Sequence, residues 1–245
     1  MNKKEILSLR YKKYRKKYGL FLLEGDKFIR DAIRKGFKPL VLISINSDTQ
    51  FRDAADGFHL FNKKDFSLLS STITPQKNIA VFKIPDPAQT NKIDKSPLNL
   101  YLDGISDPGN LGTILRSAAA FNTGAVYIGK ECAEVYSPKT VRSSAGALLD
   151  INIIPGSPET VLEASKKGRS VLAASATGKI TLNEDLRKDI KRLIIIGSEG
   201  KGVTKALTDL SDGEIKIPHE KNTESLNAAA AASVIMAHYY FNGLS

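Results

Sequence analysis

Apolar runs with no polar residues between them are the feature of this sequence that most constrains its fold. At 126–128 and 193–196 the hydrophobic residues follow one another directly, as in strands that are covered on both faces. Helical stretches near 110–121, 158–168 and 202–210 separate the expected strands. Strands that alternate with helices predict an α/β fold with a parallel sheet. The strands are expected at 98–102, 125–128, 151–154, 171–174, 193–196 and 214–217, followed by a last helix at 225–241.

The first part of the chain predicts a smaller α/β unit. Residues 1–18 contain no helix breaker and are expected to form one helix that ends at Gly19. Residues 84–92 are polar and contain two prolines, which is typical of a linker. We therefore expect a first domain at 1–90, with a helical extension at 1–18, and a second domain at 91–245. Within the first domain, strands are expected at 40–43, 58–61 and 79–84, and helices at 26–35, near 53 and at 64–69.

The net charge of +10 is confined to the first part of the chain. Residues 1–100 carry 20 basic and 10 acidic side chains, whereas the remaining residues carry 16 of each. Residues 1–18 alone contain eight basic side chains and one acidic one. A basic part joined to a neutral part favours a polyanionic partner for the basic part. The alternative is a basic helix that is only solvated.

Several classes of protein are excluded by the composition. Cys132 is the only cysteine, so the sequence cannot form a disulfide scaffold, and a cytoplasmic location is expected. No apolar run approaches the roughly 20 residues of a membrane span, and no apolar signal core follows the basic start. His59, His219 and His238 show no spacing with other ligand residues that resembles a metal site. We therefore expect neither a membrane nor a metal as a partner.

The loop at 103–116 follows the first expected strand of the second domain. Gly104 and Gly109 have the interval of a phosphate-binding P-loop, but Asn110 stands where that motif requires lysine. No serine or threonine follows Asn110 to hold magnesium. A nucleoside triphosphatase is therefore excluded.

Two further loops follow later strands. Residues 196–203 include three glycines, which favours close approach of the backbone to a ligand, but their order differs from the dinucleotide fingerprint. A glycine-capped turn is the alternative. Residues 217–229 form a polar loop that enters the last helix, where Thr223 or Ser225 could serve as the N-cap.

These loops carry four recognisable segments: DPGNLGTILR at 107–116, LIIIGSEGKG at 193–202, IKIP at 215–218 and ESLNAA at 224–229. Together they resemble the signature motifs of the SpoU (TrmH-type) RNA 2′-O-ribose methyltransferases of the SPOUT superfamily. Residues 137–147 are similar to a further segment of that family. The resemblance is specific over about 100–242. It is looser over 19–85, where FLLEG at 21–25 carries it.

The resemblance implies a C-terminal α/β methyltransferase domain with a deep trefoil knot, preceded by a small basic substrate-binding domain. It implies S-adenosylmethionine as the cofactor, held in a bent form by the backbone of the knotted loops, and a homodimer with the active site near the subunit interface. The reaction would methylate a ribose 2′-hydroxyl of structured RNA. Ribosomal RNA is preferred, because an amino-terminal extension accompanies this kind of domain in the ribosomal members. Transfer RNA, or a non-catalytic RNA-binding role, is the alternative.

The family pattern also assigns roles to residues of this chain. The residues expected around the reacting ribose are Asn110, Arg116, Glu199, Ser225 and Asn227. The residues expected to bind the cofactor are Gly197, Glu199, Gly200, Ile217, Pro218, Leu226 and Asn227. The residues expected to bind RNA are Lys12, Lys13, Arg15, Lys16, Glu24 and Arg142. Arg116 is the family's proposed activator of the ribose hydroxyl. A free guanidinium does not readily accept a proton. Besides the role of base, Arg116 is therefore given two alternative roles: it orients a phosphate, or it stabilises an alkoxide.

Overall fold

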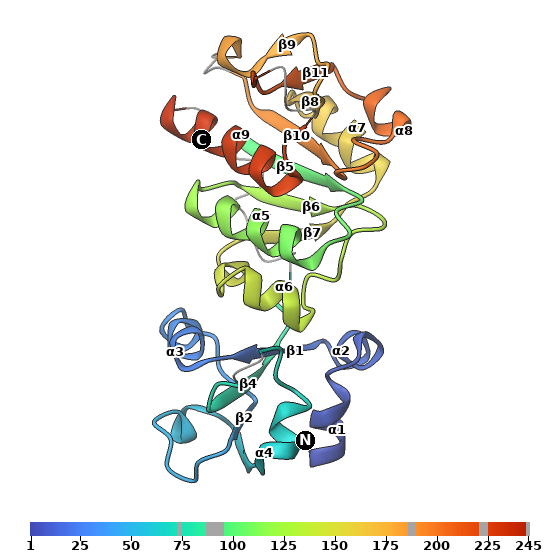
Figure 1. Cartoon of the computed structure of the whole chain (residues 1–245). Coiled ribbons are helices and arrows are strands. Elements are labelled where there is room, and N and C mark those ends of the chain that lie inside the picture. The colour runs from blue at the N-terminus through green and yellow to red at the C-terminus, as the bar shows by residue number, and fades with distance from the viewer. Residues whose placement is uncertain (73–74, 87–95, 186–189, 221–224, 244–245) are drawn as a thin grey trace. The chain divides into compact units, whose positions relative to one another are not determined.

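The computed structural model describes residues 1–245 except 73–74, 87–95, 186–189, 221–224 and 244–245. The chain forms two compact units (Figure 1). The first contains Met1–Asp86 and Glu134–Leu149, and the second contains Pro87–Ala133 and Asp150–Ser245. The boundary expected at about residue 90 lies outside the described residues. The segment Glu134–Leu149 belongs to the first unit, although we expected it in the second domain.

The first unit is built on a four-stranded mixed sheet in the order β1-β4-β2-β3. β4 pairs antiparallel with β1 and β2, and β3 pairs parallel with β2. The strands are β1 (Leu20–Glu24), β2 (Val41–Ser44), β3 (Gly57–Leu60) and β4 (Asn78–Lys83). The helices of the same part are α3 (Asp26–Arg34), η1 (Arg52–Ala54) and α4 (Lys63–Ser67). β1 was not expected, because its short apolar run cannot be told from a buried helical segment by periodicity.

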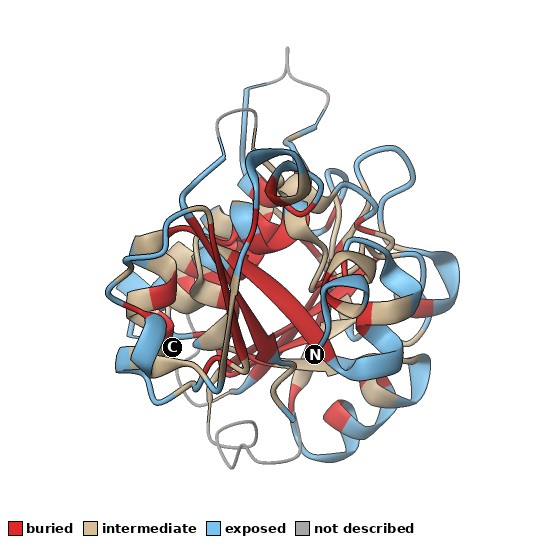
Figure 2. Cartoon of the chain, turned by 90° about the horizontal axis from the view of Figure 1, so that it is seen from below, coloured by how far each residue is buried: buried red, intermediate tan, exposed pale blue. Residues whose placement is uncertain are grey.

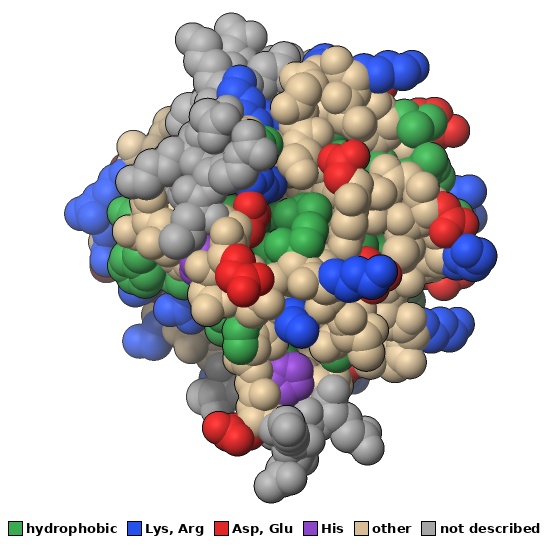
Figure 3. All heavy atoms as spheres, turned by 90° about the horizontal axis from the view of Figure 1, so that it is seen from above, with side chains coloured by type: hydrophobic (Ala, Val, Ile, Leu, Met, Phe, Trp, Pro, Cys, Tyr) green, Lys and Arg blue, Asp and Glu red, His purple; other side chains and the backbone are tan. Residues whose placement is uncertain are grey.

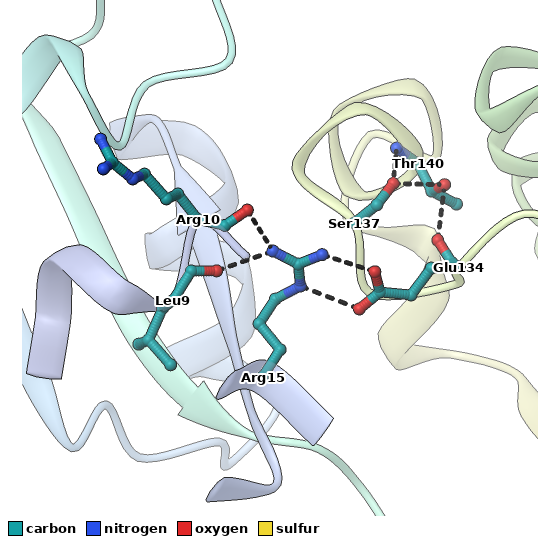
Figure 4. A network of polar contacts seen from close by, with 6 residues as sticks. All are labelled: Leu9, Arg10, Arg15, Glu134, Ser137 and Thr140. Carbon is teal, nitrogen blue, oxygen red and sulfur yellow. Dashed lines mark hydrogen bonds and ion pairs between the residues drawn. The ribbon is translucent and has the colours of Figure 1, made fainter. Parts of the chain in front are cut away.

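The amino-terminal extension forms two helices, α1 (Lys3–Ser8) and α2 (Lys12–Tyr18), so the expectation of one helix over 1–18 is wrong. Ile6 and Leu9 are fully buried in the core of the first unit. At the break between the helices, Arg15 donates hydrogen bonds from Nη1 to the carbonyl oxygens of Leu9 and Arg10 at 2.7 and 2.8 Å (Figure 4). These bonds satisfy carbonyl groups that a helix end leaves without partners.

The segment Glu134–Leu149 completes the first unit. It carries α6 (Pro138–Ser143) and η3 (Ala147–Leu149), and α6 packs against β1. The Glu134 carboxylate accepts a hydrogen bond from Arg15 Nε at 2.8 Å and forms an ion pair with the same guanidinium (Figure 4). The ring centroids of Phe21 and Tyr136 are 5.2 Å apart. Arg15 and Glu134 are separated by 119 positions, so no local sequence pattern could predict this contact.

The second unit contains a seven-stranded parallel sheet in the order β7-β6-β5-β10-β8-β11-β9. The predicted α/β fold with a parallel sheet is therefore confirmed, and buried residues concentrate on the strands (Figure 2). The strands are β5 (Leu98–Asp103), β6 (Ala125–Ile128), β7 (Asn152–Pro155), β8 (Ser170–Ala174), β9 (Ile180–Thr181), β10 (Arg192–Gly197) and β11 (Gly213–Lys216). The trefoil knot stays a prediction.

The helices of the second unit are α5 (Pro108–Ala120), α7 (Pro158–Lys166), η4 (Leu182–Glu184), α8 (Lys205–Thr208) and α9 (Ala228–Phe241). α5 and α9 pack against each other. α9 starts at Ala228 and its N-cap is Asn227. This corrects the expected start at 225, with Ser225 or Thr223 as the cap; Thr223 lies outside the described residues.

The surface and the polar residues of the second unit agree with its balanced charge. In the face shown in Figure 3, basic and acidic side chains are interspersed. Cys132 donates a hydrogen bond from Sγ to the Leu102 carbonyl oxygen at 3.2 Å, and burial raises the pKa of its thiol.

None of the described helices is long and apolar enough to cross a membrane. Within the described residues, no three His, Cys, Asp or Glu side chains are grouped so that they could hold a metal ion. The cytoplasmic location stays a prediction.

Candidate functional site

The three motif loops follow the carboxyl ends of parallel strands in the second unit. The loop after β5 enters α5, the loop after β10 holds Glu199, and the loop after β11 leads to α9. Asp103, at the end of β5, ties two of these loops together, because its Oδ2 accepts a hydrogen bond from the Thr204 backbone N–H at 2.7 Å. This edge of an open parallel sheet is where α/β domains bind their ligands.

Asn110, Glu199 and Asn227 form a hydrogen-bonded cluster at this edge. Asn110 Nδ2 donates to Glu199 Oε1 at 2.9 Å. Asn227 Nδ2 donates to the same carboxylate oxygen and to Asn110 Oδ1, the latter at 3.2 Å. The structure therefore brings together three of the five residues that the sequence predicted around the reacting ribose.

Two helix N-termini position the asparagines of this cluster. Asp107 caps α5 by accepting a hydrogen bond from the Asn110 backbone N–H at 3.0 Å. Asn227 caps α9, and its Oδ1 accepts from the N–H groups of Ala229 and Ala230 at 2.9 and 3.2 Å. Because an N-terminus carries a partial positive charge, the two helices favour a negative group at the position of Glu199.

A cavity of about 330 Å³ includes Glu199 in its wall. Of the other residues that the sequence assigned to the cofactor, Gly197, Ile217 and Leu226 line this cavity, and the predicted catalytic residue Ser225 lines it as well. Gly200, Pro218 and Asn227 are not part of its lining. The wall also contains residues that the sequence analysis missed, chiefly 173–176 at the end of β8, together with Val203 and His219. Their position directly after a buried strand is the signal that could have found 173–176.

The glycines of the second motif have different roles. A Cβ at Gly197 would lie 2.0 Å from the carbonyl carbon of Gly202 and 2.2 Å from the backbone nitrogen of Val203. A Cβ at Gly200 would meet no atom of the described residues within 4 Å. The Gly202 N–H donates to the Ser198 carbonyl oxygen at 2.8 Å, which closes the turn between them. The close packing of backbone within this turn therefore requires glycine at 197 but not at 200, and the expected approach of the backbone to a ligand stays a prediction.

Arg116 lies outside the hydrogen-bonded cluster. It follows Asn110 by six residues on α5, which places it about 9 Å further along the helix axis and roughly 120° around it. Its side chain is exposed and has no hydrogen bond or ion pair with another described residue. The guanidinium is thus exposed on α5, and its role in catalysis stays a prediction.

The residues expected to bind RNA divide into exposed and engaged side chains. Lys12, Lys13 and Lys16 are exposed on α2. Arg15, on the same helix, is 3% exposed and uses its guanidinium within the first unit, so we correct its expected role from RNA contact to structural support. Glu24 likewise uses its carboxylate to hold a loop of its own unit.

Comparison with known proteins identifies the family. Residues 97–237 match the model of the SpoU rRNA Methylase family, and residues 2–80 match that of the MRM3-like substrate binding domain. The chain belongs to the SpoU rRNA methylase family. The predicted resemblance and the predicted RNA methyltransferase activity are confirmed.

Individual SpoU relatives match over nearly their full length. The chain is 30% identical over 240 residues to the 23S rRNA (guanosine(2553)-2′-O)-methyltransferase RlmP of Bacillus subtilis, covering 96% of this chain and 94% of RlmP. A TrmH-family protein from Porphyromonas gingivalis is 29% identical with a TM-score of 0.81, covering 97% of this chain and 96% of its own. The SpoU methyltransferase AviRb from Streptomyces viridochromogenes, in complex with AdoMet, is 24% identical with a TM-score of 0.86, covering 99% of this chain and 98% of its own. These neighbours confirm the fold.

We expect Gly197→Ala to lower the affinity of this SpoU methylase for S-adenosylmethionine far more than Gly200→Ala does. The added Cβ at Gly197 meets backbone that cannot rotate away, and overpacking of this kind costs about 1–3 kcal/mol. Calorimetric titration with S-adenosylmethionine measures the two affinities, and circular dichroism verifies that both variants are folded. A folded Gly197→Ala protein with wild-type affinity would show that the turn does not shape the pocket.

Proposed function

We propose that this SpoU methylase transfers a methyl group from S-adenosylmethionine to a ribose 2′-hydroxyl of structured RNA, and that this RNA is ribosomal. The observation that carries the proposal is the Asn110–Glu199–Asn227 cluster in and beside the cavity at the ends of the parallel strands. Support comes from RlmP, whose name specifies a 2′-O position in 23S rRNA, and from AviRb, whose structure contains AdoMet.

The cavity fits this cofactor in size and chemistry. Its volume of about 330 Å³ lies within the usual range of small-molecule pockets. Ala173, Ala174 and Ile196 offer small or apolar walls to a purine, and the Glu199 carboxylate offers a negative charge to a sulfonium. When bound, the cofactor supplies an electrophilic methyl group.

The residues of the cluster orient the ribose for this transfer, since alignment is the main task that the chain must perform. Asn110 and Asn227 fix the Glu199 carboxylate in one orientation through Oε1. The second oxygen of Glu199 is then placed to accept a hydrogen bond from the ribose hydroxyl. Arg116 supplies a cationic fork for the neighbouring phosphate or for the developing alkoxide.

Incubation with labelled S-adenosylmethionine and RNA from a strain that lacks the gene tests this function. We expect label in ribosomal RNA, at one ribose that becomes resistant to alkaline cleavage. Label in transfer RNA alone would assign the enzyme to that substrate. Binding of S-adenosylmethionine without methylation of either RNA would favour the non-catalytic alternative.

We propose that the exposed lysines of α2 supply much of the RNA affinity. Removal of residues 1–18 is an unsuitable test, because Ile6 and Leu9 belong to the core of the first unit. The test variant has Lys12, Lys13 and Lys16 changed to Gln. The negative slope of its log affinity against log salt should become shallower by about 2, since each phosphate contact contributes about 0.7–0.9 to the magnitude of the slope. Lys63, Lys64 and Lys77, also exposed in the first unit, provide a control triple. Equal slopes for wild type and the α2 variant would show that the lysines of α2 are only solvated and do not contact RNA.

We also propose that the enzyme is a homodimer that buries the end of α9. Val234, Tyr240 and Phe241 are 41%, 44% and 77% exposed, and Phe121 on the end of α5 packs against both aromatic rings. Phe241→Glu should raise the dimer dissociation constant by about a hundredfold, because aromatic anchors dominate interfaces. Sedimentation velocity over a concentration series measures the change. Leu162→Glu, a 41% exposed residue on α7, is the control, and an equal effect of both variants would argue against this interface.

A further inference from the structure

A second pocket, of about 280 Å³, lies within the first unit. Four stretches of chain line it: the end of β1 with the start of α3, described residues between α4 and β4, Ile79 on β4, and one side of α6. Its volume is at the lower limit of pockets for small molecules, about 300 Å³, so its occupant is a single small group. The presence of α6 in the wall means that the pocket exists only when Glu134–Leu149 completes the unit.

One wall of this pocket is the half-buried ring of Phe28. Two glycines lie near this ring. A Cβ at Gly25 would lie 3.6 Å from Phe28 Cδ2, and a Cβ at Gly146 would lie 3.5 Å from Phe28 Cδ1. Both glycines have positive φ angles, of 108° and 81°, so glycine is the residue that suits these positions. The start of α3 and the segment Glu134–Leu149 therefore both come close to the Phe28 ring.

Glu24 holds residues 70–72 and Gln76, and Ser71, Thr72 and Gln76 line the pocket. Its carboxylate accepts hydrogen bonds from Ser70 Oγ at 2.7 Å, from the Ser71 N–H at 3.0 Å and from the Gln76 N–H at 3.0 Å. Thr72 Oγ1 donates to the same carboxylate at 3.1 Å. These bonds hold residues 70–72 and the backbone of Gln76 in place before any ligand arrives. Glu24 is therefore a positioning residue.

The charged and amide side chains of the lining suit a nucleotide. Lys27 and Arg142 are exposed cations at the pocket, and Arg142 donates from Nη1 to the Ser71 carbonyl oxygen, which anchors its guanidinium. Asp26 and Gln76 offer acceptors and donors that match the edge of a base. Unpaired bases of RNA are recognised by this combination of an aromatic face, polar edge contacts and a cation for the phosphate.

We propose that this pocket, in the first unit and lined by Phe28, Ser71 and Arg142, binds one unpaired base of the RNA substrate, stacked on Phe28. The proposal rests on the proposed function, because it assigns a subsite to that RNA. It also gives Glu134–Leu149 a role in substrate recognition, although this segment is inserted between β6 and β7 of the second unit.

Binding of labelled single-stranded octaribonucleotides tests the pocket. The probes are octamers of uridine, of adenosine and of cytidine, and one that alternates guanosine and uridine, measured by fluorescence anisotropy. Phe28→Leu keeps apolar volume and removes the aromatic face, whereas Phe28→Tyr keeps the face. Phe58→Leu is the matched control, because Phe58 is also half-buried in the first unit but lies outside the pocket lining.

We expect Phe28→Leu to weaken at least one octamer about tenfold, because stacking on one aromatic ring typically contributes that much or more. Phe28→Tyr should bind like the wild type, and so should Phe58→Leu. Unchanged affinity of Phe28→Leu for all four octamers, or an equal loss in Phe58→Leu, would overturn the proposal. Calorimetry with S-adenosylmethionine and the methylation assay separate this result from the proposed function. If the enzyme is active but Phe28→Leu leaves octamer binding unchanged, only the proposed base subsite is overturned. If Phe28→Leu weakens RNA binding but the enzyme methylates no RNA, only the proposed catalytic function is overturned.

Discussion

Arg116→Lys should reduce methyl transfer by at least about a hundredfold, which corresponds to roughly 2.7 kcal/mol of transition-state stabilisation. The variant keeps a positive charge but loses the planar fork that directs two hydrogen bonds at once. Because Arg116 is exposed and has no partner among the described residues, the loss would not come from unfolding. Single-turnover transfer to the cognate RNA measures the effect, and calorimetry should show nearly unchanged affinity for S-adenosylmethionine.

The pH profile of the same variant separates the two roles of Arg116. If Arg116 were a base, lysine could partly replace it, and the activity of Arg116→Lys would climb toward the lysine pKa of about 10.4. If the fork orients phosphate and ribose, Arg116→Lys should fail at every pH, and this is the outcome we expect. Arg34→Lys, an exposed arginine of the first unit, is the control. Activity of Arg116→Ala within about threefold of wild type, a difference of roughly 0.65 kcal/mol, would remove Arg116 from the catalytic residues.

The Asn110–Glu199–Asn227 cluster could be predicted because its members lie in motif segments that resemble those of the SpoU family. Apolar runs fixed the positions of β5 and β10 within one residue at each end. The resemblance placed Asn110, Glu199 and Asn227 around one ribose, and the loops at the carboxyl ends of parallel strands do share one edge of the sheet. The hydrogen bonds among Asn110, Glu199 and Asn227 show that these side chains meet, whereas their role at the ribose stays a prediction.

What could not be predicted depends on contacts between distant positions. The buried guanidinium of Arg15 pairs with Glu134, which is 119 residues away. The periodicity of residues 1–18 cannot predict so distant a partner. Gly197 and Gly200 are equivalent as letters in one motif, yet only the backbone of Gly202 and Val203 shows which of them lacks room for a side chain. Tertiary contacts therefore decided the roles that the motif left open.

A buried ion pair at the start of β10 supports the second unit. Arg192 Nε donates to Asp185 Oδ2 at 2.9 Å, and the Tyr239 hydroxyl on α9 donates to the same carboxylate. All three residues are buried: Arg192 is 4% exposed, Asp185 is 9% exposed and Tyr239 is 1% exposed. Burial raises the pKa of Asp185, but the hydrogen bonds from Arg192 and Tyr239 outweigh it and hold that pKa below its usual range.

Asp185→Ala should therefore lower the free energy of unfolding by about 3–5 kcal/mol, because it leaves the Arg192 guanidinium buried without a counter-ion. The double variant Asp185→Leu with Arg192→Met should recover most of this loss, since an apolar pair of similar volume removes both charges. Urea unfolding at pH 7 measures all three proteins. Asp209→Ala, which breaks the exposed pair between Lys205 and Asp209, should change little.

The pH dependence of the same proteins gives the sign of the effect. A carboxyl group whose pKa is lower in the folded state than in the unfolded state stabilises the fold above its unfolded pKa, here near 3.8, and this contribution disappears as the pH falls through the lower folded pKa. Wild type should therefore lose stability below about pH 4 more steeply than the double variant. Two results would show that the ion pair does not support the fold. One is an equal loss of stability with falling pH in wild type and the double variant, and the other is an Asp185→Ala protein as stable as wild type at pH 7.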